Sequence, residues 1–188
     1  MGAVIGNYQG IGATVGCSPT RVLRFLPGVL TLILFALTGC AMDKEGKVRA
    51  QLGNWVVLGD TAFFKSGWDC TAGVFDVTSD SIKNRIVSVN DTDRGLRLIA
   101  SGKPVAFEIA GKTPDQVHRA LDKTDHATGT AILISVLAAK ECFGDELAAS
   151  YLQMLNTGSA VLMFDPPNAA VAVFDRAENR IFFGRGTL

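Results

Sequence analysis

The chain has 188 residues, of which 48% are hydrophobic and 19% charged, with 18 basic and 18 acidic side chains. A formal net charge of zero argues against the basic footprint of a nucleic-acid-binding domain, and the apolar excess argues against a disordered chain. The length fits one domain with short additional segments.

A short apolar segment follows two arginines near the N-terminus. Residues 25–37 read FLPGVLTLILFAL without a charge, and Arg21 and Arg24 precede them. This segment underfills a bilayer, whose hydrocarbon core takes about 20 helical residues to span. A basic region before such a run is typical of a secretory signal peptide. An uncleaved membrane anchor is the alternative, because residues 25–42 carry no charge.

The apolar segment ends in Leu-Thr-Gly-Cys at residues 37–40, and residues 21–40 together resemble the signal of bacterial lipoproteins. The resemblance implies cleavage between Gly39 and Cys40, diacylglycerol on the Cys40 sulfur and an acylated new amino terminus. Because Ala41 rather than aspartate follows, the resemblance favours the outer over the inner membrane, with the globular part in the periplasm. The alternative is that Cys40 is an ordinary cysteine ending a secretory signal or membrane helix.

These features divide the chain into three parts. Residues 1–39 are interpreted as an N-terminal extension and a cleaved signal peptide, residues 40–53 as a lipidated tether or short helix, and residues 54–188 as a periplasmic domain. All acidic side chains follow Cys40, so the mature chain carries a net charge of −2 and no polybasic patch. We therefore expect contact with the membrane through the acyl chains and no nucleic-acid partner.

Two cysteines, Cys70 and Cys142, remain in the sequence after Cys40. In an oxidising compartment such a pair is expected to form one disulfide. Two buried free thiols are the alternative, because the sequence does not show whether their Cα atoms lie close enough to be bridged.

The first part of the predicted domain contains a helix and a hairpin. Residues 43–52 have the apolar spacing of a short amphipathic helix or a stiff tether. Residues 56–64 and 70–77 have strand composition around a turn, which predicts a hairpin carrying Cys70. Residues 80–89 are ambiguous, with Ile82, Ile86 and Val89 at helical spacing. A helix over 96–100 and a strand over 105–109 follow.

The middle of the chain has the clearest local signal. Thr113, Pro114 and Gln116 form a capping-box pattern with proline at the first helical position, which predicts a helix to about Lys123. Residues 130–142 (TAILISVLAAKEC) are apolar nearly all round and predict a buried central helix, with a buried strand over 131–136 as the alternative. Residues 124–129 are predicted as a loop, and 145–155 as a further helix after Gly144.

Three strand-like runs separated by polar turns close the chain, at residues 161–164, 169–174 and 180–184. They predict an antiparallel meander. The fold class is therefore α+β: an antiparallel sheet, made of the N-terminal hairpin and the C-terminal three-strand meander, packed with several helices on one face in a single domain. The runs at 161–164 and 181–183 are apolar on both faces, which indicates either core or an interaction surface.

Few residues are candidates for chemistry. His118 lies at helical spacing from Asp115 and Asp122, so a carboxylate could orient its ring as a general base or metal ligand; a solvent-facing histidine is the alternative. His126 lies in the predicted loop, as a site residue or in an exposed turn. Cys142 would be the nucleophile of a thiol enzyme. Zinc-ligand spacing and a serine-nucleophile elbow are missing from the sequence, so no catalytic residue, metal or cofactor is assigned.

Three functions follow as hypotheses. The first is a membrane-tethered periplasmic lipoprotein that serves as a non-catalytic accessory or assembly protein of the cell envelope, with an envelope protein as partner. The second is a periplasmic hydrolase or thiol enzyme that uses His118 or Cys142. The third is a carrier of a small apolar ligand, which would need a pocket between the sheet and the helices.

Overall fold

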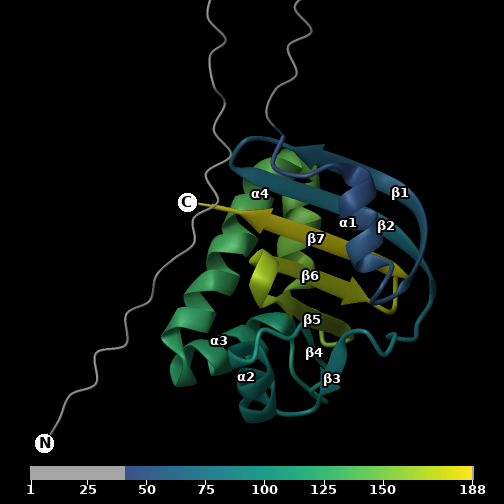
Figure 1. The fold of residues 1–188 in the computed structure, drawn as a ribbon. Helices are drawn as coiled ribbons and strands as arrows, with labels where there is room; N and C mark the ends of the chain where they lie inside the picture. Colours follow the sequence, from purple (N-terminus) through teal and green to yellow (C-terminus); the bar gives the residue numbers. More distant parts are fainter. Residues whose placement is uncertain (1–40, 188) are drawn as a thin grey trace, which may run out of the picture. The chain divides into compact units, whose positions relative to one another are not determined.

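The computed structural model describes residues 41–187, which form helices and one sheet (Figure 1). The helices of this part are α1 (Glu45–Leu52), α2 (Thr92–Ala100), α3 (Pro114–Thr124) and α4 (His126–Met154), with a short 3₁₀ helix at Pro166–Asn168. The strands are β1 (Val57–Ser66), β2 (Cys70–Ser79), β3 (Val87–Val89), β4 (Val105–Phe107), β5 (Ala160–Asp165), β6 (Ala170–Asp175) and β7 (Arg180–Gly186). The predicted α+β class is confirmed.

The predicted hairpin and meander belong to the same sheet. Its strand order is β1-β2-β7-β6-β5-β4-β3, so the last strand of the chain lies between the hairpin and the rest of the meander. In the register of β2 with β7, Cys70 lies opposite Gly186 and Asp76 opposite Arg180. The neighbouring strands are antiparallel except β3 and β4, which are parallel.

The ambiguous segment 80–89 ends in a short strand instead of forming a helix. Val87 pairs with Val105 in the parallel pair β3–β4, and α2 forms the crossover that a parallel connection needs. Ile86 and Val89 are both buried, but they belong to different apolar clusters. Their helical spacing therefore arises from burial on separate faces of the sheet.

Helices cover both faces of the sheet, so the expectation that they lie on one face is wrong. One apolar cluster joins the sheet to α2, α3 and α4. A second cluster covers the opposite face, where Val48 and Leu52 of α1 pack with Trp55 (Figure 1). Side chains alternate along each strand, so Val173 enters the first cluster and Phe174 the second. Residues 161–164 and 181–183, which are apolar on both faces of their strands, are therefore part of the core.

The helix α3 begins as predicted, but the loop predicted after it is wrong. Thr113 Oγ1 accepts the Gln116 backbone N–H at 3.3 Å, and Gln116 Oε1 accepts the Thr113 N–H at 3.0 Å. Asp125 alone separates α3 from α4, because its carboxylate accepts the Ala127 N–H at 3.1 Å and the Thr128 hydroxyl at 2.8 Å. One aspartate thus ends one helix and caps the next.

The long helix α4 is the core helix, and the alternative of a strand over 131–136 is excluded. Gly144, at φ 72° and ψ 171°, breaks it into the two helical segments that the sequence predicts. By length and composition α4 is the one helix within residues 41–187 that could cross a membrane, and half of its most apolar window is buried in the fold. Core helices of soluble proteins have the same properties, so this is weak evidence for a span.

Two glycines in β7 allow α4 to lie directly on the sheet. A Cβ atom on Gly184 would lie 2.4 Å from the Ala139 Cβ, and one on Gly186 would lie 2.1 Å from the Ala138 Cβ. This close approach brings Cys142, one turn further along α4, to the start of β2.

Candidate functional site

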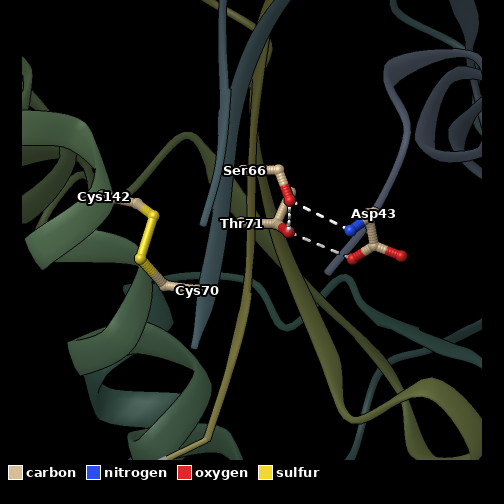
Figure 2. The surroundings of a disulfide bond; sticks show 5 residues. All are labelled: Asp43, Ser66, Cys70, Thr71 and Cys142. Atoms are coloured by element: carbon tan, nitrogen blue, oxygen red, sulfur yellow. Dashed lines mark hydrogen bonds between the residues drawn. A yellow bond between two sulfur atoms is a disulfide. The ribbon is translucent and has the colours of Figure 1, made fainter. Parts of the chain in front are cut away.

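The first residues of β2 point to opposite faces of the sheet, and each makes a long-range bond (Figure 2). On one face Cys70 is joined to Cys142 of α4, with an S–S distance of 1.97 Å and Cα atoms 6.0 Å apart. Both cysteines are buried. The predicted pairing is thus formed in the structure, and the sulfur of Cys142 is occupied, so the interpretation of Cys142 as a free nucleophile is wrong.

On the other face Thr71 holds Asp43, which is almost fully buried. The Asp43 carboxylate accepts the Thr71 hydroxyl at 3.1 Å and the Arg185 guanidinium at 3.0 Å. Its backbone N–H donates to Ser66 Oγ at 2.9 Å, and Lys47 lies 3.7 Å from the carboxylate. A buried carboxylate requires such partners, because an unpaired buried charge is strongly destabilising. We call Asp43, Ser66, Thr71 and Arg185 the Asp43 cluster.

The Asp43 cluster fixes the chain immediately after the predicted lipidation site. The Met42 N–H donates to the Gly67 carbonyl at 2.7 Å, so the backbone is held at the β1–β2 turn from residue 42 onward. Cys40 itself, with the predicted signal peptide 1–39, lies outside the described residues. The sequence gives no signal for this cluster, because its other members, Ser66, Thr71 and Arg185, lie 23 to 142 residues from Asp43.

The two histidines take part in structural contacts. His118 Nε2 lies 3.1 Å from the Gly129 carbonyl, and no carboxylate orients it: Asp115 pairs with Arg119, and Asp122 with His126. The interpretation in which a carboxylate orients His118 is therefore wrong, and His118 is half-buried instead of facing solvent freely. His126 lies in the first turn of α4 with its ring largely exposed. Residues 41–187 contain no group of three metal-ligating side chains.

An apolar groove lies between α3, the two segments of α4 and β5. Its volume is about 380 Å³, and it is lined mainly by aliphatic side chains, with His118, Asp115 and Asn156 among them. Leu133, Leu137 and Leu152 in this groove are each about 40% exposed. The sequence does not predict this groove, since its lining comes from elements between residues 114 and 162. A local signal is the apolar pair Leu133 and Leu137, four residues apart on α4.

A second hollow, at the end of β4, is built around an ion pair. Arg176 bonds the Glu108 carboxylate and also donates to the Asp80 carbonyl at 3.2 Å. Burial raises the pKa of Glu108, but the hydrogen bonds from Arg176 and Ser88 and the charge of Arg176 outweigh it, so the pKa is lowered overall. The Glu108–Arg176 pair connects the end of β4 to the turn after β6, so its role is structural.

Tyr151 is the one buried polar side chain of the described region without a hydrogen-bond partner. Its ring packs against Phe143 and Phe182, with centroids 4.9 and 6.1 Å away. Burial raises the pKa of the phenol, so the hydroxyl stays neutral. These contacts place Tyr151 in the core and give it no reactive neighbour.

We expect the Cys70–Cys142 bridge to stabilise the domain. Replacing both cysteines with alanine should lower the free energy of unfolding by about 2–4 kcal/mol, because the bridge closes a long loop in the unfolded chain. Thermal or denaturant unfolding measures this loss. Reduction of the wild-type protein should give a similar loss and add two hydrogens to its intact mass, whereas reduction of the double variant should change neither quantity. Equal stability of oxidised and reduced wild type would contradict the prediction.

The Glu108–Arg176 pair should give a small stabilisation that depends on pH. The pKa of Glu108 is lower in the folded protein than its ordinary value of 4.5, so its contribution is present above pH 4.5 and is lost as pH falls through the folded-state pKa. Glu108→Gln should cost less than about 1 kcal/mol at pH 7, since the pair is a third exposed. Unfolding curves from pH 3 to 7 test this, with the exposed Glu178→Gln as control. A Glu108→Gln deficit that does not shrink in acid would refute the prediction.

Known proteins provide no guide to this site. No protein-family model matches the chain, and neither the curated protein sequences nor the solved structures contain a match. The chemistry of the chain itself is therefore the basis for a function.

Proposed function

We propose that the protein is an exported lipoprotein, held in the membrane by acyl chains on Cys40, with a non-catalytic accessory role in the cell envelope. The observation that carries this proposal is the Cys70–Cys142 bridge. Disulfides persist in oxidising compartments such as the periplasm and are rare in the cytosol. The bridge therefore supports export. Export is also what the lipoprotein-like segment at residues 21–40 predicts.

The anchor follows from the lipoprotein resemblance of residues 21–40. Two or more acyl chains give stable anchoring, at about 0.8 kcal/mol per buried CH₂ group, whereas one chain binds only marginally. Ala41 after the modified cysteine favours the outer membrane, with the domain facing the periplasm. An envelope protein is the partner class that this location favours.

The contacts of the candidate catalytic residues favour a non-catalytic role over an enzyme. A thiol enzyme would need a free Cys142, whose sulfur is bonded to Cys70. A hydrolase that uses His118 would need a carboxylate or a nucleophile beside the ring, and the ring nitrogen instead contacts a backbone carbonyl. Exposed leucines on α4 are more typical of a surface that meets another molecule.

Cys40→Ser should release the domain from the membrane, because the acyl chains are its anchor. Fractionation of cells should move the variant from the membrane to the soluble envelope fraction, and metabolic labelling with a fatty acid should be lost. Cys17→Ser is the matched control, because Cys17 lies in the segment that the signal interpretation removes. Membrane association and labelling that survive in Cys40→Ser would overturn the proposal.

The groove between α3 and α4 favours a second candidate function, the carriage of a small apolar ligand. Its volume of about 380 Å³ lies within the range of ligand pockets, roughly 300–1,000 Å³. Its leucines remain about 40% exposed, however, so a bound molecule would keep one side open to water. Because of this openness, we favour the accessory role over the carriage of a ligand.

The carrier function predicts saturable binding of the apolar dye 1-anilinonaphthalene-8-sulfonate in the groove. Leu137→Gln should weaken this binding about tenfold, because a leucine contact is worth about 1.5 kcal/mol or more when buried. Val57→Gln is the control, since Val57 is equally exposed but lies on β1, outside the groove. A fluorescence titration without saturation, or equal affinities of the two variants, would exclude the carrier.

A further inference from the structure

Trp68, in the turn between β1 and β2, is the most exposed large apolar residue among those described. Its side chain is 80% exposed, whereas the other exposed large apolar residues are about 40% exposed. Trp55, the other tryptophan, is buried. A tryptophan with no neighbour to cover it is an unusual feature at the tip of a hairpin, because burying its large ring is a major source of stability.

This turn lies where the chain joins the fold. Met42 donates its N–H to the carbonyl of Gly67, which directly precedes Trp68. Cys40 is two residues before Met42, so covalent geometry alone keeps the two Cα atoms within about 7 Å. In Figure 1 the first residues of the blue segment lie beside the end of the β1–β2 hairpin. The residue two positions after the proposed lipidation site is therefore held beside the residue that precedes Trp68.

The connection between them is rigid on the protein side. Asp43 is buried and bonded to Thr71 and Arg185, and the carbonyl of Asp69 accepts the Thr187 N–H at 2.9 Å. The disulfide at Cys70 fixes the next residue to α4. Because the backbone is held from Met42 onward, only Ala41 lies between the proposed acylation site and the fixed part of the domain, so a bilayer that held Cys40 would lie close to this turn.

We propose that the β1–β2 turn is a membrane-contact surface, with Trp68 inserted in the headgroup region of the bilayer that holds the acyl chains. This inference rests on the proposed lipid anchor. Tryptophan favours the membrane–water interface, because its apolar ring can be buried while its N–H stays hydrated.

The charges around the turn fit a lipid surface. Lys44 and Lys65 are exposed near it and can meet anionic headgroups, whereas Lys47 is exposed but lies 3.7 Å from the Asp43 carboxylate. Of the nearby acidic groups, Glu45 is bonded to the Thr61 hydroxyl and Asp43 is buried in its cluster. Asp69 is half-buried.

The contact would fix the orientation of the domain. In the pairing of β2 with β7, Cys70 lies opposite Gly186 at the turn end, and Asp76 lies opposite Arg180 at the far end. These ends are six residues apart, roughly 20 Å along the strands. The turn between β6 and β7, which carries Glu178, therefore points away from the membrane.

Tryptophan fluorescence of the acylated protein in vesicles tests this arrangement. The full mature protein is reconstituted in phosphatidylethanolamine–phosphatidylglycerol vesicles, and acylation is verified from the intact mass of the same sample. The difference between the spectra of wild type and Trp68→Phe isolates Trp68, because Trp55 is buried and common to both. The matched control is Trp68→Phe/Glu178→Trp, which moves the exposed tryptophan to the far turn.

The Trp68 emission should shift to shorter wavelength in vesicles and lose intensity when the lipids are brominated near the headgroup. The tryptophan at position 178 should keep a water-like spectrum and resist this quenching. An acylated, vesicle-bound protein whose Trp68 stays water-like overturns the inference and leaves the lipid anchor intact. A sample without the acyl mass overturns the proposed function and the inference with it.

Discussion

The structure depends on two adjacent residues at the start of β2. Cys70 and Thr71 point to opposite faces because successive side chains in a strand alternate. Through Cys70 the sheet is bonded to α4, and through Thr71 it holds Asp43, which leads into α1 (Figure 2). A single point of one strand thus fixes the helices on both faces. The same point lies beside the site where we propose that the membrane is reached.

The proposed lipid anchor and membrane contact lie at this end of the molecule, and the proposed ligand site lies in the groove. The bridge supports the proposed export, and the Asp43 cluster holds the backbone at the residues that lead into α1. The groove lies between α3 and α4, with leucines that remain exposed. Under these proposals, one part of the domain would face a lipid surface, while another would be open to a partner or a ligand.

Much of the fold could be predicted because its signals are local. The capping box at Thr113 needs only four residues, the break at Gly144 needs one, and the final meander needs alternating runs separated by polar turns. The position of α1 could not be predicted, since it depends on a second apolar face that sequence spacing does not distinguish from the first. The groove and the Asp43 cluster combine distant segments, so the sequence marks only the apolar pair on α4 and gives no local pattern for the Asp43 cluster.

The position of β7 bears on when the fold can form. This strand pairs with β2 on one side and β6 on the other, and it follows the other six described strands in the sequence. Until it is in place, the hairpin has no contact with the other strands through the sheet. Completion of the sheet therefore waits for the C-terminal residues, and the long-range pairing involved is intrinsically slow. A chain cut short before β7 would therefore lack the strand that joins the hairpin to the rest of the sheet.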